Sequence, residues 1–170
     1  TLNISKDTSL FMVEHAQRLG ISSFQCETSD ISFQNASVKA CAYAIELKDK
    51  EILLQEASED INLKDFKCVF MRKDPPVDQD YMNTLHLLDL ASSEGANIIN
   101  DPSAVKKFNE KIFALYFAKY IPNTIITSKV SEIKSFAQDF NEIVIKPLNG
   151  MGGESIYKLN EISSKEEAII

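Results

Sequence analysis

The stretch of the chain best suited to chemistry is Ile143–Ile156, which reads IVIKPLNGMGGESI. A short apolar run ends in Lys146, and Gly150, Gly152 and Gly153 follow within a few residues. Glycines leave main-chain N–H groups free of side-chain bulk, so such a loop can lie close to phosphate oxygens and donate hydrogen bonds to them. Because Lys146 adds a positive charge beside the loop, the segment predicts a phosphate-binding site.

Extended runs on both sides of the glycines distinguish this loop from two familiar phosphate loops. A Walker A loop opens a helix after GK[ST], and a dinucleotide fingerprint also opens a helix. Here Glu142–Lys146 and Glu154–Leu159 both read as strands. A strand–loop–strand unit is instead a flap that can close over a nucleotide. The alternative is a plain glycine-rich hairpin turn, which the glycines alone do not exclude.

Two other polar stretches are weaker candidates when read singly. Lys106–Lys111 (KKFNEK) is typical of a solvated helix face. Met71–Pro76 (MRKDPP) follows a short apolar run, which places it at the carboxyl end of a strand, where open α/β sheets bind ligands. There, Arg72 and Lys73 either face a substrate carboxylate or are solvent-facing charges on a rigid turn.

Hydrophobic periodicity and turn residues predict the elements that position these stretches. Helices are expected at Ser9–Leu19, Tyr81–Ser93, Asp101 to about Phe117, and Ser131–Phe140. Strands are expected at residues 21–26, Ser37–Leu47, Lys67–Met71, Ala96–Ile99 and Thr124–Thr127, with a turn at Asn35. The alternation of strands and helices predicts an α/β domain with a parallel sheet over residues 1–105, and the pattern then changes.

Composition excludes several classes of protein. The net charge is −7, with lysines scattered among acids, which argues against a nucleic-acid partner. No apolar run approaches the roughly 20 residues of a membrane helix, and no signal peptide is expected. The three cysteines, Cys26, Cys41 and Cys68, lack metal-ligand spacing and are typical of a reducing cytoplasm. The first and last residues read as cut ends.

Taken together, these stretches resemble the bacterial glutathione synthetase family of the ATP-grasp superfamily. The phrases MRKDPP and KPLxGMGG are specific to it, although Asn149 stands where many members have aspartate. The similarity runs in the family's order along almost the whole chain. It is carried by Lys6–Gly20, Val69–Pro76, Asn100–Leu115, Ile121–Thr127 and Ile143–Tyr157.

The resemblance implies a Rossmann-like, parallel-sheet pre-ATP-grasp domain over residues 1–105 that lacks its first strand. The first part of an ATP-grasp α+β domain would follow over residues 106–170. In this arrangement the lysines contact ATP and the loop covers its phosphates. The implied ATP-binding residues are Lys111, Lys146, Gly150, Met151, Gly152, Gly153 and Ser155, and the implied substrate-binding residues are Arg72, Lys73 and Asp74.

The resemblance also implies the activity of the parent protein, a cytoplasmic and homo-oligomeric ligase. It would join γ-glutamylcysteine to glycine through an acyl phosphate, using ATP and Mg²⁺. The magnesium ligands are expected beyond Ile170, so no metal ligand or catalytic residue is assigned, and residues 1–170 alone are expected to lack ligase activity. The alternatives are another ATP-grasp carboxylate–amine ligase and a non-catalytic nucleotide-binding remnant.

Overall fold

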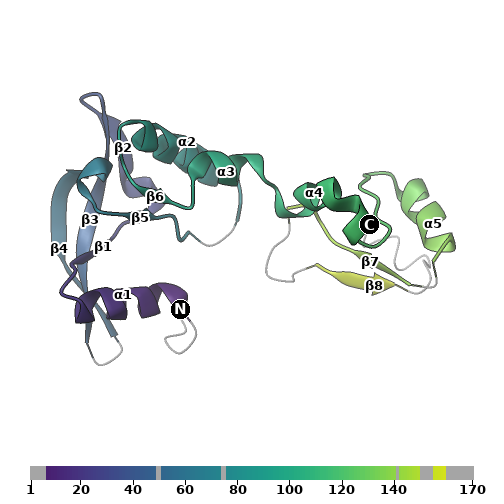
Figure 1. The fold of residues 1–170 in the computed structure, drawn as a ribbon, viewed down its shortest axis with the longest axis horizontal. Helices are drawn as coiled ribbons and strands as arrows, with labels where there is room; N and C mark the ends of the chain where they lie inside the picture. The colour runs from purple at the N-terminus through teal and green to yellow at the C-terminus, as the bar shows by residue number, and fades with distance from the viewer. Residues whose placement is uncertain (1–6, 49–50, 74–75, 141, 150–154, 160–170) are drawn as a thin grey trace. The chain divides into compact units, whose positions relative to one another are not determined.

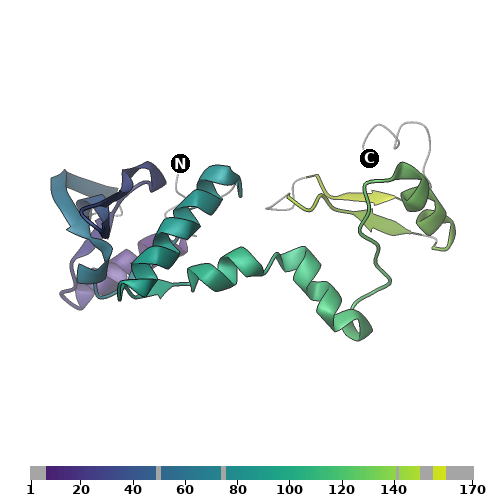
Figure 2. The same cartoon turned by 90° about the horizontal axis from the view of Figure 1, so that it is seen from above.

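Helices and sheets both occur in the chain, which has the mixed α/β class that the sequence predicts. A computed structural model describes residues 7–48, 51–73, 76–140, 142–149 and 155–159. The chain divides into two compact units, Thr1–Lys107 and Phe108–Ile170 (Figures 1 and 2). Within the described residues, no helix is both long and apolar enough to cross a membrane.

The larger sheet of the first unit is antiparallel, so the expected parallel sheet is not confirmed there. Its central strand β3 pairs with each of the other three strands (Figure 1). The chain reverses directly from β2 into β3 and from β3 into β4, and such short connections join antiparallel strands. The strands are β1 (Ser23–Gln25), β2 (Ile31–Gln34), β3 (Ser37–Lys48) and β4 (Glu51–Asn62).

The turn between β2 and β3 uses a backbone conformation that few residues adopt easily. Asn35 and Ala36 have φ values of 52° and 58°, and the flanking residues Gln34 and Ser37 are paired. A two-residue hairpin loop with both φ values positive matches the right-handed twist of its strands. Asparagine tolerates this conformation, whereas the Cβ of alanine is crowded in it.

Replacing Ala36 by glycine is therefore expected to stabilise the fold by about 0.5–1 kcal/mol, because glycine has no Cβ to crowd at positive φ. The midpoint of urea denaturation measures this change. As a matched control, Ala16→Gly changes a right-handed residue inside a helix and should destabilise by up to about 1 kcal/mol. A lower midpoint for Ala36→Gly would contradict the strain assigned to this turn.

The one parallel pair among the described strands lies beside this sheet. β5 (Val69–Phe70) pairs with β6 (Ile98–Ile99), and α2 (Gln79–Ser93) connects them. The sequence predicted this strand–helix–strand unit. The side chain of Asp78 caps α2 by accepting from the main-chain N–H of Tyr81 at 2.9 Å. The helix packs apolar residues onto β3, and the core consists of Val38, Ala40, Leu63, Leu85, Leu88, Ala91, Ala96 and Ile98.

Side chains from two helices bond to the main chain of β3. Glu94, at the end of α2, accepts from the hydroxyl of Ser37 and the N–H of Val38, both at 3.1 Å. In α1 (Thr8–Arg18), the amide of Gln17 donates to the carbonyl of Leu47 at 3.1 Å and accepts from its N–H at 2.9 Å. These contacts satisfy main-chain groups that lie outside the strand ladder.

The second unit is built from short elements. Its described hairpin consists of two antiparallel strands, and the longest of its described helices has the half-buried residues Ile133, Phe136 and Ala137 along one side. The elements are α4 (Glu110–Phe113), the 3₁₀ segment η3 (Ala114–Tyr120), α5 (Val130–Gln138), β7 (Ile143–Ile145) and β8 (Tyr157–Leu159).

The helix expected from Asp101 to about Phe117 is wrong, because it is interrupted. The helix α3 (Pro102–Lys107) ends before Asn109, and α4 begins after it. The Asn109 side chain accepts from the N–H groups of Lys111 at 3.0 Å and Ile112 at 3.1 Å. An asparagine that caps a helix in this way has extended backbone angles, so the preceding helix cannot continue through it.

One predicted strand is absent from the structure, and one observed strand was not predicted. Thr124–Thr127 is irregular rather than extended, and its hydroxyls bond locally: Thr124 donates to the carbonyl of Pro122 at 2.8 Å, and Thr127 accepts from the N–H of Lys129 at 3.0 Å. Such local bonds replace a strand ladder. The long strand β4 was not predicted, and its pairing with β3 contains register shifts at Tyr43 that break a simple period of two.

Candidate functional site

Lys146 directly follows the strand β7 in the second unit. The antiparallel pairing aligns Ile143 with Leu159 and Ile145 with Tyr157, and the buried side chains of Ile143 and Leu159 pack at one end of the hairpin. Lys146 itself is exposed and makes no hydrogen bond or ion pair with any described residue. The strands of the predicted strand–loop–strand unit are therefore confirmed, with the lysine at the start of the loop.

Lys111 lies against the segment that follows Lys146. Its Nζ donates to the carbonyl oxygen of Pro147 at 2.6 Å and to that of Leu148 at 3.2 Å. Because Asn109 caps α4, the first turn of that helix has a fixed start, and Lys111 lies in this turn. The structure thus places the Lys111 ammonium against the two residues that directly follow Lys146 in the sequence.

Only part of the predicted loop can be placed. Gly150, Met151, Gly152 and Gly153 lie outside the described residues. Ser155 is described, and its φ of 56° is in the left-handed region that non-glycine residues seldom adopt. From the predicted nucleotide site, the structure therefore places Lys111, Lys146 and Ser155, all within the second unit.

The predicted substrate residues belong to the first unit and are already in contact with neighbouring side chains. The Nε of Arg72 donates to the hydroxyl of Ser9 at 3.2 Å, and the Nζ of Lys73 lies 4.0 Å from a carboxylate oxygen of Glu27. Both cationic side chains are exposed, so a ligand could still reach them. The third predicted residue, Asp74, lies outside the described residues.

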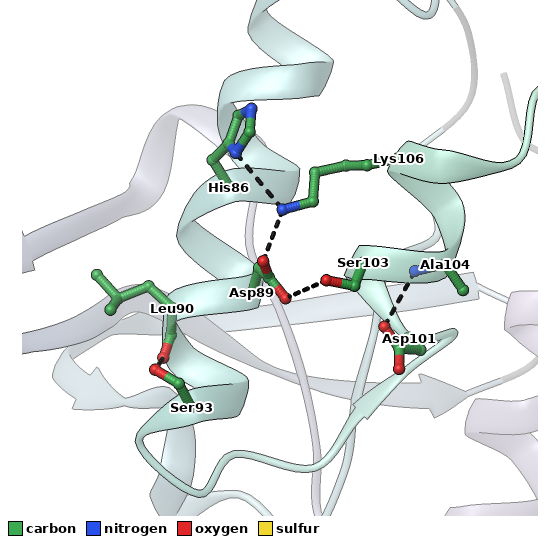
Figure 3. A network of polar contacts seen from close by, with 8 residues as sticks. All are labelled: His86, Asp89, Leu90, Ser93, Asp101, Ser103, Ala104 and Lys106. Carbon is green, nitrogen blue, oxygen red and sulfur yellow. Dashed lines mark hydrogen bonds and ion pairs between the residues drawn. The ribbon is translucent and has the colours of Figure 1, made fainter.

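Lys106 belongs to a polar network of the first unit, which Figure 3 shows in detail. Its Nζ donates to the carboxylate of Asp89 at 2.7 Å and lies 3.5 Å from Nδ1 of His86. The hydroxyl of Ser103 donates to the same carboxylate at 2.9 Å. The hydrogen bonds from Lys106 and Ser103 lower the pKa of the Asp89 carboxyl, which favours its charged form. The network joins α3 to α2.

The two end residues of the charged stretch Lys106–Lys111 therefore have different roles. Lys106, at its start, takes part in the ion pair that fixes α3, while Lys111, at its end, points to the candidate loop. The prediction of a plain solvated helix face is wrong for these two lysines. Main-chain acceptors such as those at Pro147 and Leu148 leave no trace in a sequence, so spacing alone could not reveal the second role.

Comparison with known families divides the chain at nearly the same place as its compact units. Residues 1–106 match the family model of the prokaryotic glutathione synthetase N-terminal domain. Residues 110–170 match the model of the prokaryotic glutathione synthetase ATP-grasp domain. The first match alone covers more than half of the chain. The chain belongs to the prokaryotic glutathione synthetase family.

Curated glutathione synthetases are similar to the chain along its length. The glutathione synthetase of Vibrio parahaemolyticus is 35% identical over 172 positions, covering 100% of the chain and 54% of that relative. Those of Salmonella typhi and Escherichia coli O157:H7 are 34% and 33% identical over 162 positions, each covering 94% of the chain and 51% of the relative. The chain thus spans about half the length of the curated relatives it matches.

The Cys26 thiol of this glutathione synthetase family member is not poised for nucleophilic chemistry. Burial, with smaller contributions from Asp30 and Glu27, raises the pKa of the Cys26 thiol to about 11. A thiol with that pKa stays protonated near neutral pH, and the thiolate is the reactive form. None of the described cysteines, Cys26, Cys41 and Cys68, forms a disulfide bond.

Asn109 begins the helix that carries Lys111 in this family member, and sequence reasoning missed this cap. It is followed by Glu110, and an asparagine before an acidic first-turn residue is a recognised signal for a helix start. The signal was obscured because Phe108 and Ile112 continue the apolar spacing of the preceding helix. Reading the cap would have placed Lys111 in the first turn of a new helix.

Proposed function

We propose that the full-length protein containing this chain is a glutathione synthase, an ATP-dependent ligase that joins γ-glutamylcysteine to glycine. Membership of the family and similarity to curated glutathione synthetases along the whole chain support this activity. The structural observation that carries the proposal is the approach of Lys111 to the segment after Lys146. Two cations near one glycine-rich loop suit a polyphosphate, because charge-assisted hydrogen bonds to anions are strong.

The proposed reaction has two steps. A carboxylate oxygen of the cysteinyl residue attacks the γ-phosphorus of ATP, which breaks the bond to the bridging oxygen and releases ADP. The amine of glycine then attacks the acyl phosphate carbonyl, losing a proton and expelling phosphate as the amide forms. Lys111 and Lys146 would balance the charge of the phosphates, and main-chain N–H groups of Gly150, Met151, Gly152 and Gly153 would cover them.

Magnesium belongs to the proposal. The described residues contain no group of three or more histidine, cysteine, aspartate or glutamate side chains that could hold a metal ion. The proposal places its ligands in the other half of the full-length protein.

The substrate side of the proposal rests on the first unit. Arg72, Lys73 and Asp74 follow β5, and the exposed cations there suit a substrate carboxylate. The parallel β5–α2–β6 unit supports a Rossmann-like core for this region. The family matches over residues 1–106 and 110–170 support the proposed domain boundary near residues 105 and 106. Cysteines that form no disulfide suit a reducing compartment, so we also propose a cytoplasmic location. A homo-oligomer stays a prediction.

Turnover by the purified full-length protein tests the proposal. With ATP, γ-glutamylcysteine and glycine, ADP and glutathione should form in equal amounts. Omitting γ-glutamylcysteine should abolish ADP release, and omitting glycine should limit ADP release to about one molecule per enzyme, because the acyl phosphate then has no acceptor. Comparing kcat/KM across acceptor amines tests specificity. A higher value for another acceptor would indicate a different ATP-grasp ligase, and no ADP release with any pair would indicate a non-catalytic protein.

A further inference from the structure

The bonds of Lys111 connect two elements that the chain itself keeps apart. Its Nζ donates at 2.6 Å to the carbonyl of Pro147 and at 3.2 Å to that of Leu148, which lie 36 and 37 residues further along the chain. A lysine ammonium carries three N–H donors, and two of them are directed at these oxygens. The bonds therefore join α4 to the segment that begins with Lys146.

We propose that Lys111 is a positioning residue for Lys146, acting through the carbonyls of Pro147 and Leu148. Lys146 immediately precedes Pro147, whose ring fixes one backbone angle and whose steric bulk restricts the residue before it. Fixing the carbonyl of Pro147 therefore limits where the Cα of Lys146 can lie. For nucleotide binding, this inference rests on the proposed function.

The geometry differs from that of an ordinary surface ion pair on the same hairpin. Lys158 lies 2.8 Å from the carboxylate of Glu142, and both side chains are largely exposed. That pair has two flexible partners, and such pairs contribute little to stability. In contrast, half-buried Lys111 bonds to main-chain oxygens. Only one flexible side chain, that of Lys111, then loses conformational entropy when these bonds form.

Removing both Lys111 and Lys146 should affect the free energy of nucleotide binding differently under the two possibilities. If each lysine only contacted phosphate independently, the two losses of affinity would add. If Lys111 also positions Lys146, then Lys146 is misplaced once Lys111 is gone, and removing it costs less. The free energies of binding should then be non-additive, with a smaller combined loss than the sum.

A double-mutant cycle in the full-length protein tests this, with ADP as the probe in calorimetric titrations. The variants are Lys111→Met, Lys146→Met and the double substitution, in which methionine keeps the apolar stem. Lys146→Met should weaken ADP binding by about 10- to 100-fold in the wild-type background. In the Lys111→Met background the same substitution should weaken it by less than about threefold.

The melting temperature without nucleotide is the second measurement. Lys111→Met should lower Tm by about 2 °C or more, while Lys146→Met and the matched control Lys158→Met should each lower it by less than about 1 °C. An unchanged Tm for Lys111→Met would overturn the inference. Additive losses of ADP affinity would also overturn it, even if Tm falls, because the bonds would then be only structural.

Failure of the proposed function would look different from failure of this inference. A wild-type protein that binds no ADP and has no ligase turnover would refute the proposed function, and with it the effect on nucleotide binding. The Tm of Lys111→Met would still decide whether the bonds to Pro147 and Leu148 hold the hairpin against α4.

Discussion

Replacing Lys146 by alanine in the full-length protein is expected to lower kcat by about 10²- to 10³-fold, which corresponds to about 2.7–4 kcal/mol of transition-state stabilisation. Lys146 directly follows β7 and precedes the glycine-rich sequence, so it would face charge that develops on the transferred phosphoryl group. Because it makes no hydrogen bond or ion pair with other described residues, its loss should act on the reaction rather than on the fold. Coupled detection of ADP release with γ-glutamylcysteine and glycine measures the effect.

The matched control is Lys158→Ala on the opposite strand of the same hairpin. Lys158 is exposed and pairs with Glu142, so its removal changes the net charge equally without touching the loop. Its kcat should stay within about twofold of wild type, since exposed ion pairs contribute little. Far-ultraviolet circular dichroism of both variants checks the fold. Normal turnover by Lys146→Ala would contradict the phosphate role given to this lysine.

The sequence predicted the candidate site through the types of its residues but not through their contacts. A lysine at the end of an apolar run before three glycines indicated a phosphate loop, and the strands beside it were found. The hydrogen bonds from Lys111 to the carbonyls of Pro147 and Leu148 could not be predicted from the sequence. Its acceptors are carbonyl oxygens, which every residue carries, and the partners are far apart in the chain.

Elements with strong local signals were predicted well. α1 and α2 have clear apolar spacing, and each begins at an aspartate whose side chain caps it, Asp7 or Asp78. The parallel pair of β5 and β6 followed from short apolar runs on either side of α2. In such elements the pattern of nearby residues and the packing of the fold favour the same structure.

Prediction failed where pairing between distant residues decides the structure. β4 carries several acids and irregular spacing, and it is held by the long strand β3 rather than by its own pattern. Strand propensity is sensitive to such context. The parallel sheet expected for the whole first unit failed for a different reason: the turn at Asn35 was predicted, but the two-residue connection there makes β2 and β3 antiparallel.

Replacing Leu85 by alanine should destabilise the first unit by about 2–5 kcal/mol, the usual cost of removing a large core side chain. Leu85 lies on α2 and is 0% exposed, within the cluster that contains Val38 of β3 and Ile98 of β6. The cavity left by the truncation would lie where α2 packs on both β3 and β6, so neither sheet could fill it without shifting relative to the other. Urea denaturation of the full-length protein, read from the transition of this unit, measures the change.

Leu90→Ala supplies the matched control, because it makes the same chemical change on the same helix. Leu90 is 41% exposed, so its truncation should cost about 1 kcal/mol or less. Both substitutions lower hydrophobicity equally and raise helix propensity equally, so the difference between them isolates burial. Equal losses for the two variants would show that α2 is held by something other than the packing of Leu85 against β3 and β6.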